Sequence, residues 1–446
     1  MALPAGDDPF LISRVKARWI LDSRGNPTVE VEVRTQSGGF GRAAAPAGAS
    51  KGKHEALELR DRGREFLGKG VSKAVFNVNN IIGPRLVGLD SRKQRLVDSI
   101  MCRLDGTPNK SRLGANAIVA TSIAVAKAAA STAGLPLYVY LGGSSGTVIL
   151  PTPLLNIING GAHAGNDLAF QEFMIVPLGA DTFADAMRIA SEVYHVLKQY
   201  LKEKYGADAI NVGDEGGYAP PMKHNREALD ALMEAIRRAG YSPGEDVGIS
   251  LDAAASHFYD EKRGVYIVDS KEFDAGALLE YYEALVDEYP LLSIEDPFYE
   301  EDFNSFAEMT RLLGKRILIV GDDLYVTNIE RLRRGIEVGA TNAVLLKVNQ
   351  IGTLTEAIDL YRAAVSRGMK VIVSHRSGET EDTTIAHLAV GLAAGLIKAG
   401  APARGERTAK YNELLRIEEE AAGSTLYAGI YGFRGLDGLY ASNPLY

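Results

Sequence analysis

Short apolar runs alternate with helical patterns between residues 248 and 402 of the chain. The runs are rich in β-branched residues, are bounded by turn residues and are separated by amphipathic stretches. This pattern is typical of buried parallel strands joined by crossover helices. Six of the runs end in a side chain that can act as an acid, a base or a cation. These residues are Asp252, Glu295, Asp322, Lys347, His375 and Lys398. When eight strand–helix units close into a barrel, the carboxyl ends of the strands meet on one face. The pattern therefore predicts that the six side chains converge in one pocket.

The start of the predicted barrel is less regular. Two apolar runs are followed directly by two helical patterns, with no clear strand between the helices. These four elements are expected at residues 148–158, 172–177, 182–205 and 226–239. The regular series begins near Val247 and closes with a helix over residues 405–421. We therefore predict an α/β fold, an irregular (β/α)8 barrel that opens with two strands and two helices.

The N-terminal third of the chain has a different pattern. Residues 13–45 alternate between apolar and polar and are interrupted by turn-forming segments, which predicts a three-stranded antiparallel meander. A loop rich in Gly and Ala follows at residues 44–53, and we interpret it as a movable flap. Helical patterns are found at residues 71–82, 91–104 and 114–133. The stretch 142–146 is the best linker, so we expect a smaller α+β domain over residues 1–145 and the barrel over residues 146–446.

Composition excludes several classes of function. The chain has 446 residues, a formal net charge of −8 and no basic run, so we expect no nucleic-acid partner. We also expect no membrane span, since polar residues interrupt the most apolar stretch, at residues 114–133. Cys102 is the only cysteine, which excludes an intramolecular disulfide and suits a reducing compartment. With no signal-peptide pattern at the N-terminus, these features predict a cytoplasmic protein.

The carboxylates at the strand ends indicate a metal. Asp252, Glu295 and Asp322 would repel one another at close range unless a cation lay among them. Mg2+ suits such a site because it prefers oxygen ligands and leaves positions for water and substrate. Zinc is disfavoured, since no cysteine is near and His375 has no obvious ligand spacing. The alternative is that the acids pair with lysines or cap helices, but three in succession favour the metal.

Two lysines and a short polar segment provide further candidate chemistry. Lys347 and Lys398 each follow a buried run, where burial, a nearby cation and each other's charge would lower a lysine pKa toward that of a general base. The alternative role for each is a structural partner of the carboxylates. The segment His375-Arg376-Ser377 ends a strand, and its guanidinium, hydroxyl and backbone N–H groups suit a phosphate or carboxylate.

Two glycine-rich segments lie upstream. Residues 159–166 contain His163 and are followed by Gln171 and Glu172, while residues 213–217 place Glu215 among glycines. Glycines allow a backbone to approach a ligand closely. For either segment alone, a turn with a solvated acid is the favoured interpretation. Neither segment carries a dinucleotide-binding or P-loop fingerprint.

Taken together, these motifs closely resemble the enolase family. The segments that carry the resemblance are Asp22–Pro27, Gly48–Ser50, Gly213–Gly217, Ser293–Pro297, Leu345–Thr353, Val373–Thr380 and Gly400–Arg404. The resemblance extends from about Ile12 to Glu420, nearly the whole chain. It implies a lyase that reversibly dehydrates 2-phosphoglycerate to phosphoenolpyruvate in glycolysis and gluconeogenesis.

By position, the resemblance also assigns the metal sites. Asp252, Glu295 and Asp322 would hold a first Mg2+, which binds the substrate carboxylate. Ser50, on the flap, would join the substrate phosphate in binding a second Mg2+. Two ions per active site are therefore implied, the second arriving with substrate.

The resemblance assigns the remaining roles in the same way. Lys347 would remove the proton at C2, and Glu215, assisted by Glu172, would protonate the departing C3 hydroxyl. Lys398 would help to neutralise the substrate carboxylate. The other substrate-binding residues would be His163, Gln171, His375, Arg376 and Ser377, with His163 also counted among the catalytic groups.

The resemblance further implies a homodimer or an assembly of dimers. Arg18 would reach Glu406 of the partner subunit, and Glu30 would reach Arg416 of the partner subunit.

Two rival interpretations of the function remain. Racemases, cycloisomerases and ammonia-lyases of the wider superfamily share the barrel and metal triad, but would lack the flap serine, the 213–217 acid and the His-Arg-Ser segment. A binding protein that keeps the fold but has lost catalysis would have other residues in place of the base, the acid or a metal ligand.

Overall fold

A three-stranded antiparallel sheet opens the fold, as predicted. The computed structural model describes residues 8–48, 52–143, 146–161 and 164–435. The sheet has the order β1-β2-β3, with β1 at Ile12–Leu21, β2 at Pro27–Thr35 and β3 at Phe40–Ala44. The Asp22 carboxylate accepts backbone N–H groups from Arg24 and Asn26 and so shapes the turn between β1 and β2.

The helices of the N-terminal domain pack against this sheet or against other helices. They are α1 Ser72–Asn77, η2 Val78–Ile82, α2 Gly83–Leu86, α3 Gln94–Asp105, α4 Ala115–Ala133 and α5 Leu137–Gly142. The long helix α4 lies against β2 and β3 and is buried on nearly all sides, as its apolar pattern predicted. Small residues allow the close approach, since a Cβ at Gly41 would lie 2.1 Å from the Ala124 carbonyl oxygen.

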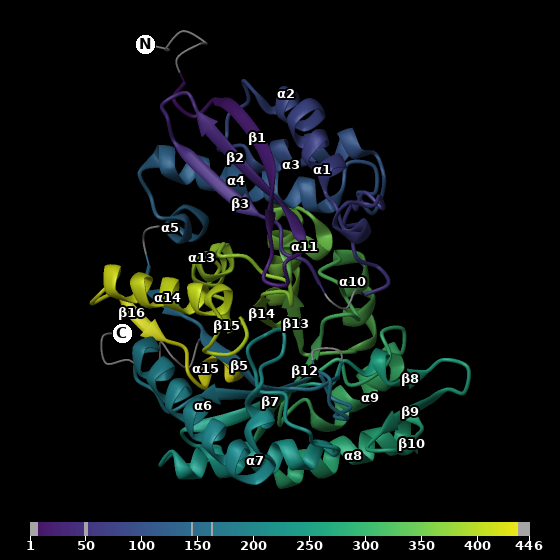
Figure 1. Cartoon of the computed structure of the whole chain (residues 1–446). Coiled ribbons are helices and arrows are strands. Elements are labelled where there is room, and N and C mark those ends of the chain that lie inside the picture. Colours follow the sequence, from purple (N-terminus) through teal and green to yellow (C-terminus); the bar gives the residue numbers. More distant parts are fainter. Residues whose placement is uncertain (1–7, 49–51, 144–145, 162–163, 436–446) are drawn as a thin grey trace.

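The second part of the chain is a closed eight-stranded barrel (Figure 1). Its strands are β5 Thr152–Asn159, β6 Glu172–Pro177, β7 Val247–Asp252, β11 Leu291–Glu295, β12 Leu318–Gly321, β13 Ala343–Leu346, β14 Lys370–Ser374 and β15 Gly395–Lys398. Two helices, α6 Phe183–Tyr205 and α7 Asn225–Arg238, separate β6 from β7. The irregular opening and the regular series from β7 onward are therefore confirmed.

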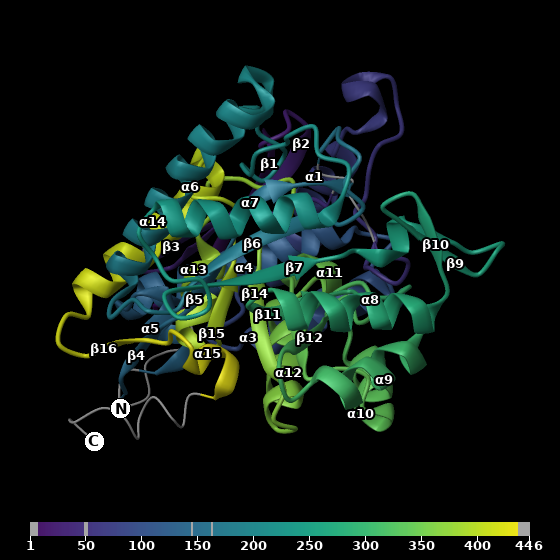
Figure 2. The same cartoon turned by 90° about the horizontal axis from the view of Figure 1, so that it is seen from below.

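Helices surround the regular part of the barrel (Figure 2). They are α8 Ala275–Glu288, α9 Phe303–Leu313, α10 Ile329–Val338, α11 Val348–Ile351, α12 Leu354–Val365, α13 Thr384–Gly391 and α14 Gly405–Glu420. Between β7 and α8 the chain forms a small sheet that the sequence did not predict, with β8 Tyr259–Asp260, β9 Val265–Val268 and β10 Lys271–Phe273. The hairpin of β9 and β10 projects from the body of the molecule (Figure 2).

Two details of the barrel differ from prediction. The single strand expected at residues 148–158 is two strands, because Pro151 has no N–H to continue a ladder. The first, β4 Val148–Leu150, pairs outside the barrel with β16 Thr425–Tyr427. In addition, β6 runs antiparallel to both neighbours. The carboxyl ends of all eight strands therefore do not meet on one face, and β6 instead brings its first residue, Glu172, beside Asp252.

The N-terminal domain lies over the face where the strands of the regular series end (Figure 1). Backbone hydrogen bonds of 2.8 Å pair Ala47 with Gly378, and the Ala56 N–H donates to the Gln350 carbonyl oxygen at 2.8 Å. The smaller domain is thus bonded to the segments that follow β13 and β14. No helix in the described ranges is both long and apolar enough to cross a membrane. The domain boundary at residues 145/146 touches residues outside the described ranges and stays a prediction.

Candidate active site

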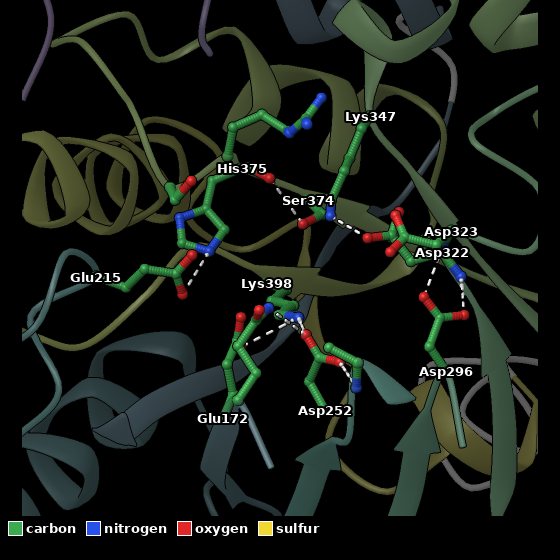
Figure 3. A pocket seen from close by; sticks show the side chains of 14 residues that line it. Glu172, Glu215, Asp252, Asp296, Asp322, Asp323, Lys347, Ser374, His375 and Lys398 are labelled. Carbon is green, nitrogen blue, oxygen red and sulfur yellow. Dashed lines mark hydrogen bonds and ion pairs between the residues drawn. The ribbon is translucent and has the colours of Figure 1, made fainter. Parts of the chain in front are cut away.

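The six side chains predicted from the strand ends lie on the same face of the barrel. Asp252, Glu295 and Lys398 are the last residues of their strands, and Asp322, Lys347 and His375 directly follow theirs. A pocket lies on this face (Figure 3). Its lining comprises Gln171, Glu172, Glu215, Asp252, Ala254, Asp296, Asp322, Asp323, Lys347, Ser374, His375, Arg376, Ser377 and Lys398.

Lys398 lies at the centre of a carboxylate cluster. Its Nζ is 2.7 Å from Glu295, 3.1 Å from Glu172 and 3.2 Å from Asp252, and all four side chains are almost fully buried. Gln171 Nε2 donates to Asp252 at 3.2 Å. Burial alone would lower the pKa of Lys398, but the charges of Asp252, Glu172 and Glu295 outweigh it and hold the pKa well above its ordinary value.

Lys347 faces Asp322 to one side of this cluster (Figure 3). The Lys347 ammonium donates to Asp322 Oδ2, while Gln350 Nε2 donates to Asp322 Oδ1 at 3.0 Å. Burial lowers the pKa of Lys347, but the charge of Asp322 outweighs it and the pKa lies above its ordinary value. The protein's own groups therefore do not lower either lysine pKa, and the part of the prediction that rests on a nearby cation stays a prediction. The sequence alone did not show how closely the carboxylates surround them.

The backbone at Lys347 is fixed by a strained loop. The Lys347 N–H donates to Thr327 Oγ1 at 2.9 Å, and that hydroxyl donates to Gln350 Oε1 at 2.8 Å. Val326 and Thr327 have φ values of 44° and 55°, which are unusual for β-branched residues. Such strain persists only where the surroundings hold it. Here the hydroxyl of Thr327 links the lysine to the network around Asp322.

Glu215 is buried opposite Lys347, and the alternative of a solvated acid is wrong. Asn156 Nδ2 donates to Glu215 Oε2 at 3.0 Å, and His375 Nε2 lies 3.4 Å from the same oxygen. Burial and the charge of Glu215 raise the pKa of Glu172 well above its ordinary value. The glycines that follow Glu215 leave no room for a larger side chain. A Cβ at Gly217 would lie 2.5 Å from Asn159 Oδ1.

Arg376 reaches the pocket from the loop after β14 and forms a two-pronged ion pair. Its Nη1 and Nη2 lie 3.0 and 2.9 Å from the carboxylate of Glu55, a residue of the N-terminal domain. Both side chains are buried. Glu55 also accepts the Gly52 N–H at 3.0 Å, so this pair connects the barrel to the segment that follows the predicted flap.

Comparison with known proteins agrees with this geometry. A family model described as "Enolase, N-terminal domain" matches residues 12–141, and one described as "Enolase, C-terminal TIM barrel domain" matches residues 147–434. Proteins named enolase from Thermococcus gammatolerans, Pyrococcus furiosus and Methanocaldococcus jannaschii are 61%, 61% and 62% identical to the chain. Each match spans 423 residues, 95% of this chain and 98% of the relative.

The chain belongs to the enolase family. The resemblance found in the sequence is thereby confirmed. Two of the residues it assigned, Ser50 and His163, lie outside the described residues.

The enolase family is metal-dependent, and the described residues fit a hard cation. Glu295 Oε1 is buried and accepts no hydrogen bond within the described part of the chain. Burial and the charge of Asp252 raise the pKa of Glu295 to about 8. Carboxylate oxygens of Asp296, Asp322 and Asp323 lie within 4.8 Å of one another. These groups offer only oxygen donors, the set that Mg2+ prefers.

Within this acidic group, Asp296 has a structural role. Its two carboxylate oxygens accept the backbone N–H groups of Asp322 and Asp323 at 2.9 and 2.7 Å. Asp296 therefore fixes the turn after β12 that carries Asp322. Sequence reasoning missed this role, although the Asp-Pro that follows Glu295 marks a strand end.

Sequence reasoning also missed several residues that hold this enolase-family site together. They are Glu55, Asn156, Thr327, Gln350 and Arg407. None of these residues ends an apolar run. One of them, Gln350, lies within the segment Leu345–Thr353 that carried the resemblance, so that segment did mark the region.

Proposed function

We propose that this chain is an enolase that reversibly dehydrates 2-phosphoglycerate to phosphoenolpyruvate, a hydro-lyase step of glycolysis and gluconeogenesis. Membership of the family over nearly the whole chain supports the reaction. The observation that carries it in the structure is the arrangement of the pocket. Lys347 lies on one side, Glu215 on the other, and Lys398 between them (Figure 3).

Lys347 is the proposed base. Removing the proton at C2 of the substrate leaves a second negative charge next to the carboxylate, so the base must be close and the charge must be offset. Lys347 is partly buried, with 12% of its side chain exposed, and is fixed through its backbone by Thr327. The ammonium of Lys398, held among three carboxylates, supplies positive charge where the enediolate develops.

Glu215, with Glu172, is the proposed acid. The C3 hydroxyl must leave as water, and this requires a proton from the opposite side of the pocket. Glu215 and Glu172 are both buried there, and proximity of two carboxyl groups favours keeping a proton in the pair. The separation of Lys347 from this pair allows one group to accept a proton while the other donates one.

The phosphate would bind at the loop after β14. Arg376 offers a planar guanidinium that suits phosphate oxygens, and Ser377 offers a hydroxyl. His375 and Gln171 line the same pocket and would complete the contacts with the substrate. His163 would contribute from its own loop.

Two Mg2+ ions are the proposed cofactors. Asp252, Glu295 and Asp322 would hold the first, and Ser50 together with the substrate phosphate would hold the second. When bound, the ions would supply electrostatic stabilisation of the charge that develops on the substrate carboxylate. The orphaned buried oxygen Glu295 Oε1 supports the first site.

A direct assay tests this function. Purified protein is incubated with 2-phosphoglycerate, and phosphoenolpyruvate formation is followed with Mg2+ and with excess chelator. We expect turnover that the chelator abolishes and Mg2+ restores. Absence of turnover with Mg2+ present, by a protein of intact fold, would contradict the proposal. Turnover of an amino acid or a non-phosphorylated acid instead would favour the wider superfamily.

We also infer a homodimer or an assembly of dimers, in which Arg18 reaches Glu406 of the partner subunit and Glu30 reaches Arg416 of the partner subunit. Within one chain, Arg18 lies beside Glu30 and Glu32, so the proposed contacts would extend an existing charge network. Sedimentation at micromolar concentration would contradict this inference if it found a monomer.

We also propose a cytoplasmic location, because the single cysteine, Cys102, suits a reducing compartment.

A further inference from the structure

A buried arginine with no role in the proposed reaction lies behind the pocket. Arg407, in the first turn of α14, is fully buried. Its guanidinium donates to the carbonyl oxygens of Arg376 at 2.5 Å and of Asp214 at 3.1 Å, and to that of Ser377. It therefore joins the loop after β14 to the loop that carries Glu215. Gly400 leaves room for the Arg407 side chain, since a Cβ at Gly400 would lie 2.8 Å from Arg407 Cδ.

The same guanidinium contacts the ring of His375. Arg407 Nη1 lies 2.6 Å from His375 Nδ1. Arginine has N–H donors and no acceptor, so Nδ1 must be the acceptor and cannot carry a proton. The proton of a neutral His375 is then on Nε2, the nitrogen that lies 3.4 Å from Glu215 Oε2.

We propose that Arg407 is a positioning residue that fixes His375 as the neutral Nε2–H tautomer and directs that N–H at Glu215. This inference rests on the proposed function of Glu215 as the acid. Burial, together with the charge of Arg407, lowers the pKa of His375 to about 4, although the charge of Glu215 opposes this. The neutral ring is thus the form that the surroundings favour at neutral pH.

The fixed tautomer has a consequence for the acid. Glu215 Oε2 accepts a hydrogen bond from Asn156 Nδ2 at 3.0 Å. His375 Nε2 lies 3.4 Å from the same oxygen and makes no hydrogen bond within the described part of the chain. A shortening of this approach by a few tenths of an ångström would give Oε2 a second donor and leave Oε1 as the oxygen that carries the acidic proton. Arg407 would in this way select the oxygen from which Glu215 delivers its proton.

The test reads the tautomer directly. Protein labelled with 15N-histidine is studied by NMR, and His375→Gln identifies the His375 signals. We expect the wild-type ring to be protonated at Nε2 and not at Nδ1 between pH 6 and pH 8. In Arg407→Met, we expect a mixed tautomer or a ring that titrates in this range. Arg407→Lys should keep some of the wild-type tautomer, since it can still donate to Nδ1.

Lys410 provides a matched control. It lies on the same helix, its side chain is almost fully buried, and its ammonium donates to the carbonyl oxygens of Thr380 and Glu406 at 2.5 and 2.7 Å. Lys410→Met therefore also removes a buried cation from α14 but leaves the Arg407–His375 contact in place. The charged groups that face His375 are Glu215, Arg407 and Glu379. Lys410→Met leaves Glu215 and Arg407 unchanged but removes the cation that pairs with Glu379 at 3.0 Å, so the control also reports how much Glu379 contributes.

Kinetics provide the second readout. We expect Arg407→Met to lower kcat by about 10–10²-fold, the scale of a misplaced catalytic group, and to add an ionisation to its pH profile that Lys410→Met lacks. A wild-type His375 protonated at Nδ1 would overturn the proposal, even if Arg407→Met does not fold. An unchanged His375 tautomer in a folded Arg407→Met variant would also overturn the proposal. The NMR measurement of the tautomer does not depend on turnover. The turnover assay with 2-phosphoglycerate therefore tests the proposed reaction independently of the proposed role of Arg407.

Discussion

Replacement of Thr327 by valine tests whether the strained loop after β12 holds the pocket. The substitution keeps the shape of the side chain and removes only the hydroxyl. The Lys347 N–H then loses its acceptor and Gln350 Oε1 loses its donor. Thr327 and Gln350 are both buried, at 1% exposure, so water cannot readily replace the lost partners.

The expected cost follows from these contacts. Each buried group left without a partner costs about 1–3 kcal/mol, and the added methyl recovers about 1 kcal/mol. With two such groups, Thr327→Val should therefore destabilise the protein by about 1–5 kcal/mol. Thr327→Ser keeps the hydroxyl and loses one methyl, so its cost should be about 1 kcal/mol.

Both variants are compared by urea unfolding followed by circular dichroism, after reversibility has been verified. The kcat of each is measured at saturating Mg2+. We expect Thr327→Val to lose about 10²-fold in kcat, because Lys347 and Asp322 lose their alignment. Thr327→Ser should retain most of the activity. If valine costs no more stability and no more activity than serine, the hydroxyl does not support the site and the reasoning is wrong.

Three further predictions concern charge in the pocket. Glu55→Gln should strengthen inhibition by inorganic phosphate several-fold, because Arg376 loses a competing carboxylate; an unchanged inhibition constant would contradict this. Lys398→Met should abolish turnover and destabilise the fold by about 3–5 kcal/mol, since three buried carboxylates lose their cation; Mg2+ should restore part of the stability, as seen in thermal unfolding. Calorimetry should find one Mg2+ site without substrate and two with it, and two tight sites in the free protein would count against the assignment of Ser50.

The sequence predicted the barrel and most of its pocket because each strand of the regular series is an apolar run that ends in a reactive residue. Asp252 and Lys347 were found in this way, without any knowledge of their neighbours. Glu215 and Glu172 were found only through the resemblance. Alone, an acid between glycines is indistinguishable from a turn, and Glu172 lies at the start of an antiparallel strand.

Other features could not be predicted because they depend on contacts between distant segments. Arg407 lies among charged residues of α14 and has the pattern of a solvated helix face, yet it is fully buried. Thr327 ends no apolar run, and its positive φ cannot be inferred from a β-branched residue. The carboxylates that raise the pKa values of Lys347 and Lys398 could not be counted from the sequence, because their number is set by the packing.

The separation of base and acid is the central claim, and exchange of the C2 proton tests it most directly. 2-Phosphoglycerate is incubated with each variant in deuterated solvent, and deuterium at C2 is followed by NMR alongside turnover. Lys347→Ala should abolish both exchange and turnover. Glu215→Gln should lower turnover by about 10²–10⁴-fold and still exchange the C2 proton, because Lys347 and Lys398 remain in place. Exchange that persists in a folded Lys347→Ala variant would contradict the assignment of the base.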